Sequence, residues 1–261
     1  METEYVDHDG RTTAFRRTAR GADGPPVLFV HGSGGSHRIW KAQLSRLSRD
    51  VPVVALDLSG HGDSDDVDTP PGEETLHAYA RDVLAVAEET GASVLCGNSL
   101  GGAVVLRAVL DHGADPDALV LAGSGAKLTV ADPLREWLDD DFERAVAFLH
   151  GEDRLFHDPD DRLLELSRDG MEAVGRAVTR RDFLSCHTFD VRDRLDEVTA
   201  PTLALTGEHD ALTPPAYHEF LAEHVPDAEW TTVPDAAHLA MLENPTAFDE
   251  ALLGFLDDLD L

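Results

Sequence analysis

Short, continuous apolar segments alternate with amphipathic helical segments along most of the chain, and this alternation limits the possible folds. Uninterrupted apolar strands are typical of a parallel sheet that is covered on both faces. The apolar runs predict buried strands at residues 26–30, 51–58, 93–97, 118–122, 202–206 and 229–233. Helical spacing lies between or after them, at residues 40–47, 76–87, 100–111 and 248–259. We therefore predict right-handed βαβ units and a doubly wound, mostly parallel α/β sheet, with a strand near residues 12–18 at its edge.

One region, residues 125–197, has no strand pattern. Its apolar residues predict three helices, marked by Phe142, Val146 and Leu149, by Leu163, Leu164 and Leu166, and by Met171, Val174 and Val178. We expect a core domain formed by residues 1–124 and 198–261, with residues 125–197 as a helical cap over one edge of the sheet. Ordinary covering helices are the alternative.

The chain is strongly acidic. It has 51 Asp and Glu against 21 Lys and Arg, a formal net charge of −30, and only two lysines, Lys41 and Lys127. An acidic site for a cation or a basic partner is one interpretation, and a surface adapted to high salt is the other. The acids are dispersed, with one dense patch at Asp139–Asp141, which together with the scarcity of lysine favours a halophile. Nucleic acids and anionic membranes are poor partners for such a charge.

Targeting signals are not evident in the sequence. Residues 1–10 are polar and acidic and lack an apolar signal core, and no run of eighteen apolar residues occurs. Two cysteines, Cys96 and Cys186, cannot form a disulfide framework. We expect a cytoplasmic protein with free, buried thiols, present as a monomer or homodimer.

A Gly-x-Ser-x-Gly sequence directly follows one of the predicted strands. Gly97-Asn98-Ser99-Leu100-Gly101 joins that strand to the helix at residues 100–111. A sharp strand-to-helix turn, permitted by the glycines, would present the Ser99 hydroxyl above the end of the strand. The N-terminus of the helix would stabilise a developing oxyanion. The pentapeptide alone is a weak signal, and a plain turn with Ser99 as N-cap is the alternative.

Together with three other regions, this segment resembles the α/β-hydrolase family, in particular its capped esterase-like and C–C-hydrolase-like members. His31-Gly32-Ser33-Gly34-Gly35 is similar to the oxyanion loop of the family, and residues 57–64 are similar to its loop after the next strand. Residues 207–210 and 237–238 look like the acid and histidine loops, and the chain order Ser, Asp, His is that of the family. Ala237 is a small departure, since Gly often precedes the histidine. The resemblance covers essentially the whole chain.

A serine nucleophile needs a base, and the base must be held by a carboxylate. His238 lies between a predicted strand and the C-terminal helix, so it can reach the sheet edge that carries Ser99. Asp210, Glu208 and Asp235 compete by proximity as the acid. The resemblance, together with a position beyond a strand end, favours Asp210. We therefore expect Ser99 as nucleophile, His238 as base and Asp210 as the orienting acid.

The resemblance also implies an oxyanion hole formed by the backbone N–H groups of Ser33 and Leu100. Apolar side chains of the predicted cap favour a pocket for an apolar acyl or alcohol group. The expected pocket residues are Leu149, Phe156, Phe183 and Leu184 from the cap, with Trp40 lining the pocket from below. Packing inside the cap is the alternative for each of them.

We interpret the other histidines as structural. His31 would shape its glycine-rich loop, His61 would form a hydrogen bond within a tight turn, and His209 would point away from the site, with the rest at the surface. The sequence has no His-x-x-Glu-His or paired-Cys pattern, no phosphate-loop lysine and no Gly-x-Gly-x-x-Gly spacing. We expect neither a metal nor a cofactor.

These features predict a serine hydrolase that cleaves a small carboxylic ester through an acyl-enzyme. An aspartyl nucleophile is disfavoured because residue 99 is Ser. C–C bond hydrolysis and thioesterase, lactonase or perhydrolase chemistry could use the same triad and remain alternatives. A non-enzymatic binder of small molecules is disfavoured because such a protein would usually have lost one of the three residues.

Overall fold

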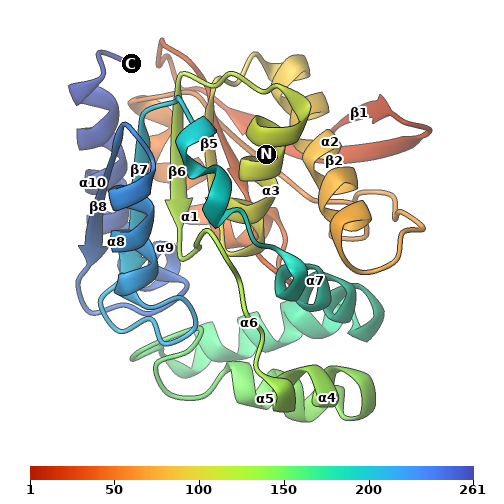
Figure 1. The fold of residues 1–261 in the computed structure, drawn as a ribbon. Coiled ribbons are helices and arrows are strands. Elements are labelled where there is room, and N and C mark those ends of the chain that lie inside the picture. The colour runs from red at the N-terminus through yellow and green to blue at the C-terminus, as the bar shows by residue number, and fades with distance from the viewer.

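The computed structural model describes all 261 residues, and its centre is one eight-stranded sheet (Figure 1). The strand order is β1-β2-β4-β3-β5-β6-β7-β8, in which β1 and β2 run antiparallel to their neighbours and the other pairs are parallel. The predicted doubly wound, mostly parallel sheet is confirmed. The strands are β1 (Glu4–His8), β2 (Arg11–Thr18), β3 (Val27–Val30), β4 (Val53–Leu56), β5 (Val94–Asn98), β6 (Ala118–Ala122), β7 (Thr202–Gly207) and β8 (Ala228–Val233).

Helices cover both faces of the sheet and bury one core of 64 apolar residues. Both cysteines are free and buried, as predicted. No helix is long and apolar enough to span a membrane. The helical elements outside the β6–β7 connection are η1 (His37–Trp40), α1 (Lys41–Arg46), η2 (Leu47–Arg49), α2 (Glu73–Thr90), α3 (Leu100–His112), α8 (Pro215–His224), α9 (Ala240–Glu243) and α10 (Pro245–Asp258).

The strand near residues 12–18 does not lie at the edge, so that prediction is wrong. This strand, β2, lies between β4 and β1, and β1 forms the edge. None of its five residues is buried, since they alternate between partly buried and exposed, so β1 lacks the apolar run that marks the central strands. A usable signal was the turn: Asp9 and Gly10 both have positive φ, 48° and 75°, which suits the tight two-residue connection of a hairpin.

The direction of the connections reverses at the centre of the sheet. The connection after β3 leads to β4 on one side, whereas the connection after β5 leads to β6 on the other. Because both crossovers are right-handed, α1 and α3 lie on opposite faces. The loops that follow β3 and β5 therefore diverge and leave a crevice at the carboxyl ends of these neighbouring strands, where ligands bind in open α/β sheets. Ser33 and Ser99 belong to these two loops.

Four helices and one 3₁₀ segment lie between β6 and β7, with no strand among them. In Figure 1 the arrowheads of β6 and β8 point toward this layer of helices. The layer therefore covers the carboxyl-end crevice. Its elements are α4 (Asp132–Asp140), α5 (Phe142–Leu149), α6 (Asp161–Val174), α7 (Arg176–Thr188) and η3 (Arg192–Glu197).

The predicted helix boundaries in this layer are partly wrong. Two of the three predicted helices form one helix, α6, which runs unbroken through Gly170 and ends before Gly175. Gly170 faces open space, so it causes no change of direction, whereas Gly175 adopts φ 85° and ends the helix. Val178 belongs to the next helix, α7, and α4 had no predicted counterpart.

The carboxylate of Asp182 fixes α7 to the core. It is fully buried and accepts hydrogen bonds from the Gly34 N–H (3.0 Å), from His61 Nε2 (2.9 Å) and from the Tyr79 hydroxyl (2.8 Å). Burial alone would raise the pKa of Asp182, but His61 and the hydrogen bonds hold that pKa below its usual range. The adjacent Arg181 adds bonds to the carbonyls of loop residues 59 and 67.

We predict that Asp182→Ala lowers the free energy of unfolding by about 3–5 kcal/mol, because it leaves buried donors and a buried histidine without their partner. Asp139→Ala is the matched control. Asp139 of α4 pairs with Arg180, which lies on α7 as Asp182 does, but the Asp139 side chain is half exposed. An exposed pair of this kind contributes about 0–1 kcal/mol. Denaturant unfolding of both variants checks the prediction, and equal losses would contradict it.

Candidate active site

A sharp turn between β5 and α3 presents Ser99. Its backbone has φ 55° and ψ −116°, a strained conformation for a residue with a side chain. The flanking glycines cannot be replaced without a clash. A Cβ on Gly97 would lie 2.3 Å from the Gly101 carbonyl oxygen, and a Cβ on Gly101 would lie 2.4 Å from that of Val30. The strand, the turn and the helix can approach this closely only because both side chains are absent.

The Ser99 side chain does not cap α3, because it accepts no hydrogen bond from the first turn of the helix. The hydroxyl instead borders the cavity described below. Leu100 follows at the first position of α3, where an N–H has no partner within the helix. The Ser33 N–H also has no hydrogen-bond partner in the protein. The turn and the loop after β3 thus leave a hydroxyl and backbone donors available for a ligand.

Asp210 and His238 form a buried pair. The Asp210 carboxylate oxygen Oδ2 lies 2.8 Å from His238 Nδ1 and accepts a second bond from the Thr213 hydroxyl at 2.7 Å. Oδ1 accepts the backbone N–H groups of Leu212 and Thr213. Burial alone would raise the pKa of Asp210, but His238 and these hydrogen bonds hold the pKa below its usual value. The competing acids Glu208 and Asp235 are exposed and form no bond with His238.

The histidine loop is held on both sides. Asn98 Nδ2, next to Ser99, donates to the His238 carbonyl oxygen at 3.3 Å. The His238 N–H donates to the carbonyl of Arg154, and the Leu239 N–H donates to that of Leu155, both in the connection between α5 and α6. Ser99 and His238 border the same cavity, but no hydrogen bond joins their side chains. Such bonds are often long in unliganded enzymes and shorten when substrate binds.

Two other histidines at strand ends have the expected kind of role. His31 Nε2 accepts the Leu58 N–H at 3.0 Å, and burial lowers the pKa of His31 to about 4, so the ring is neutral. His61 lies 3.2 Å from the Ser59 carbonyl within its own turn. Its second bond, to Asp182 of α7, was not predicted. That bond joins residues 121 positions apart, and no local pattern indicates it.

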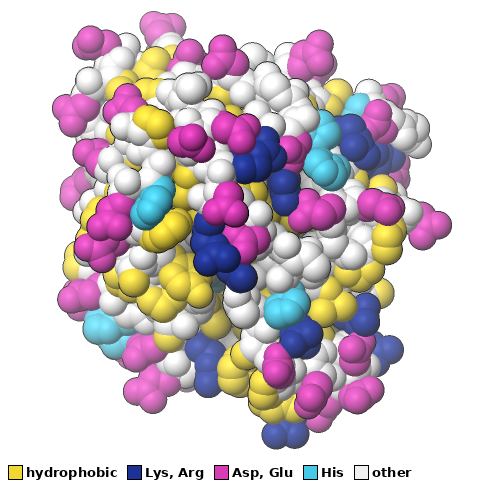
Figure 2. Space-filling model, in the orientation of Figure 1, with side chains coloured by type: hydrophobic (Ala, Val, Ile, Leu, Met, Phe, Trp, Pro, Cys, Tyr) yellow, Lys and Arg dark blue, Asp and Glu magenta, His cyan; other side chains and the backbone are white.

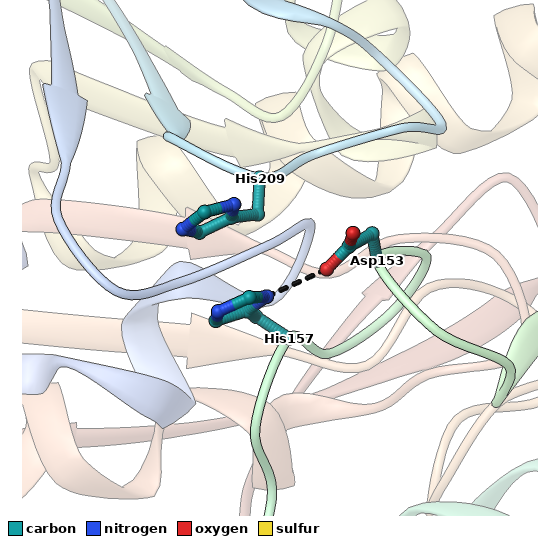
Figure 3. A group of neighbouring side chains, drawn as sticks. All are labelled: Asp153, His157 and His209. Carbon is teal, nitrogen blue, oxygen red and sulfur yellow. Dashed lines mark hydrogen bonds and ion pairs between the residues drawn. The ribbon is translucent and has the colours of Figure 1, made fainter.

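The ring of His209 lies against the connection between α5 and α6. It stacks on His157, with ring centroids 3.6 Å apart and planes at 6°, and His157 bonds to Asp153 at 2.6 Å (Figure 3). Possible ligand atoms of these three residues lie within 4.8 Å of one another. However, imidazole lone pairs lie in the ring plane, so two parallel rings do not direct them at one ion. As arranged, the cluster joins the acid loop to residues 153–157.

The prediction that all remaining histidines lie at the surface is wrong for His150 and His218, which are both buried. His218 Nε2 accepts the Ser124 N–H at 3.1 Å, and burial lowers the pKa of His218 to about 4. His150 is bonded to the Val146 carbonyl and to Ser167. His218 lies on α8 and His150 lies at the end of α5. The sequence shows the apolar face of such a helix, but it does not show which polar side chains are buried beside that face.

A cavity of about 1060 Å³ lies between the sheet and the helical layer, and half of its lining residues are apolar. Ser99, His238 and Ser33 border it together with Phe183, one of the expected pocket residues. The other expected pocket residues do not border it: Leu149, Phe156, Leu184 and Trp40.

Packing elsewhere explains three of these four differences. Trp40 is enclosed between Phe29 and Phe248 in the core, and Leu149 and Phe156 are buried within the helical layer. Apolar residues of α6 border the cavity instead, among them Leu163 and Met171. Their helical spacing was visible in the sequence, but spacing alone does not show which apolar face meets a cavity.

Cys186 also borders the cavity, and its Sγ lies 3.7 Å from Ser33 Oγ. Burial raises the pKa of the Cys186 thiol to about 12, so the thiol remains protonated near neutral pH. It therefore does not compete with Ser99 as a nucleophile. Its contact instead places α7 directly against the loop that follows β3.

Comparisons with known proteins agree with this architecture. The family model described as "Alpha/beta hydrolase family" matches residues 27–251. The pimeloyl-[acyl-carrier protein] methyl ester esterase of Neisseria meningitidis is 29% identical, over 88% of this chain and 93% of that protein. The 3-oxoadipate enol-lactonase 1 of Acinetobacter baylyi is 25% identical, over 89% of this chain and 88% of that protein.

Solved structures include a thermophilic esterase that is 31% identical and superposes with a TM-score of 0.86, covering 99% of this chain and 98% of its own. The strained turn at Ser99, the paired Asp210 and His238, and the cavity they border all lie within or beside the matched segment. The chain belongs to the alpha/beta hydrolase family and is a hydrolytic enzyme.

Proposed function

We propose that the protein hydrolyses a small carboxylic ester through an acyl-enzyme formed on Ser99. The observation that carries the proposal is the buried Asp210–His238 pair, which borders the same cavity as a serine in a strained strand-to-helix turn. The esterases among the similar proteins support the ester as the substrate class. A lactone is an internal ester, so the similarity to an enol-lactonase is consistent with the same chemistry.

In the proposed reaction each of these groups has one role. His238 Nε2 takes the proton from Ser99 as its Oγ attacks the ester carbonyl carbon, while Asp210 holds Nδ1–H and stabilises the imidazolium. The oxygen of the tetrahedral intermediate accepts hydrogen bonds from the N–H groups of Ser33 and Leu100. The intermediate expels the alcohol, which receives the proton from His238. Water, deprotonated by His238, then attacks the acyl carbon. The second tetrahedral intermediate breaks its bond to Ser99 Oγ, which receives the proton from His238, and the acid is released.

We further propose that residues 125–197 act as a cap that selects the substrate. They cover the crevice above Ser99 and contribute apolar side chains of α6 and α7 to the cavity. An apolar acyl or alcohol group would contact these side chains. The cap also shapes the catalytic loops, because α7 contacts Ser33 and Gly34 directly.

We predict that Ser99→Ala lowers kcat/KM for p-nitrophenyl esters by about 10⁴-fold or more, since the acyl-enzyme cannot form. Labelling by a fluorophosphonate should disappear in the same variant. Ser93→Ala is the matched control, because Ser93 precedes the other end of β5. Normal ester hydrolysis by Ser99→Ala, or labelling at another residue, would disprove the proposed nucleophile.

The surface charge supports a second proposal, that the protein is adapted to high salt. Figure 2 shows Asp and Glu side chains distributed over the whole visible face, with few Lys and Arg between them. The Debye length is about 30 Å at 0.01 M salt and about 3 Å at 1 M, so salt removes most repulsion among these charges. The net charge of −30 makes this repulsion large.

We predict that the melting temperature rises between 0.05 M and 2 M KCl and that activity is retained at the higher concentration. The double variant Glu136→Gln, Asp140→Asn removes two exposed acids and should gain more stability at 0.05 M than at 2 M. Thermal melts of both proteins across a salt series test this. A melting temperature that is flat or falls with salt would contradict the adaptation.

A further inference from the structure

The cavity at Ser99 has a charge opposite to that of the rest of the molecule. Acids make up 51 of the 261 residues, yet none of the 36 residues that line the cavity is Asp or Glu. Four cationic residues do line it: Arg38, Lys41, Arg46 and Arg154. One of the two lysines in the chain is therefore at this site.

Three of these cations have no carboxylate partner. Arg46 bonds to Asp249 at 2.5 Å, so its charge is compensated. Arg38, Lys41 and Arg154 form no ion pair. Some cations elsewhere, such as Arg49, are also unpaired, but these three line one cavity that has no acidic lining residue, so their charge is available to a ligand that enters it.

The three cations approach the cavity from two sides. Arg38 and Lys41 lie on η1 and α1, just after the loop that holds Ser33, and both are exposed. Arg154 lies in the cap connection and is half-buried, with its guanidinium 3.6 Å over the ring of Phe148. The guanidinium donates one hydrogen bond, to the Phe148 carbonyl oxygen, and its other N–H groups have no partner in the protein.

Catalysis alone explains only part of this pattern. A carboxylate near Ser99 would oppose the oxyanion that forms there, so the absence of acids follows from the proposed mechanism. The oxyanion is bound by backbone N–H groups, however, and needs no side-chain cation. The three unpaired cations therefore point to a second negative charge, carried by the substrate itself.

We propose that these cations form a subsite for a carboxylate at the far end of the substrate, which is then the half-ester of a dicarboxylic acid. This inference rests on the proposed ester hydrolysis at Ser99. The apolar residues of α6 and α7 would contact the methylene chain between the ester and the free carboxylate. The local cations also offset the repulsion that a net charge of −30 exerts on an anion.

The test compares monomethyl esters of linear dicarboxylic acids with the dimethyl esters of the same acids. The wild-type enzyme should show kcat/KM at least about tenfold higher for the monomethyl ester, a ratio equivalent to about 1.4 kcal/mol. The ratio should shrink as KCl is raised, because salt screens exposed charges. Every comparison between variants uses one salt concentration at which melts show the protein folded.

Single variants identify the residues. Arg38→Gln and Lys41→Gln should each lower kcat/KM for the monomethyl ester several-fold and leave the dimethyl ester unchanged. Arg154→Gln should lower kcat/KM for the monomethyl ester more than for the dimethyl ester, because residue 154 also helps to hold the His238 loop. Arg49→Gln is the matched control, because Arg49 is also exposed and forms no ion pair but does not border the cavity. Arg49→Gln should leave kcat/KM unchanged for both esters.

The outcomes separate the two proposals. Equal or faster turnover of the dimethyl ester, with Gln variants that affect both substrates alike, would overturn the carboxylate subsite and leave the serine hydrolase intact. Hydrolysis of neither ester, with no fluorophosphonate labelling of Ser99, would overturn both. A selective loss for the monomethyl ester in at least one of the three variants supports the subsite.

Discussion

The carboxylate of Asp182 is the one fully buried charge that joins helix α7 to three other parts of the molecule at once. It belongs to α7, between β6 and β7, yet its partners come from the loop after β3, the loop after β4 and helix α2. Breaking such a buried charged network leaves several donors without partners, which costs far more than the loss of a surface contact. The shape of the loop that holds Ser33 therefore depends on α7 as well as on the sheet.

The topology of the sheet supplies the other condition for the site. Only where the connections reverse, at β3 and β5, do two neighbouring strands send their loops in opposite directions. Glycines then allow close approach where a Cβ would collide with backbone: a Cβ on Gly207 would lie 2.1 Å from the Ala237 carbonyl oxygen. The acid loop and the histidine loop meet at that point. The site thus results from strand order and from missing side chains as much as from the reactive residues.

The sequence predicted the parts of this protein that are encoded locally. Ser99 lies in a short motif, and the strands that carry Ser99 and Asp210 are continuous apolar runs, so fold class and candidate triad were accessible. The cavity was not, because Phe183 borders it while Leu184 does not, and only the packing of α6 and α7 decides between such neighbours. Long-range bonds between buried polar groups, such as His61 with Asp182, leave no periodic signal at all.

The backbone bonds between the histidine loop and residues 154–155 limit how this enzyme can diverge. Because the N–H groups of His238 and Leu239 are bonded to the α5–α6 connection, replacing all of residues 125–197 by the corresponding residues of a relative would disturb the base as well as the pocket. Helix α6 is different, since it packs mainly on its neighbours α5 and α7 and carries none of these bonds. New substrate preferences are therefore expected to arise by single substitutions on its cavity face, which makes α6 the natural target for directed evolution.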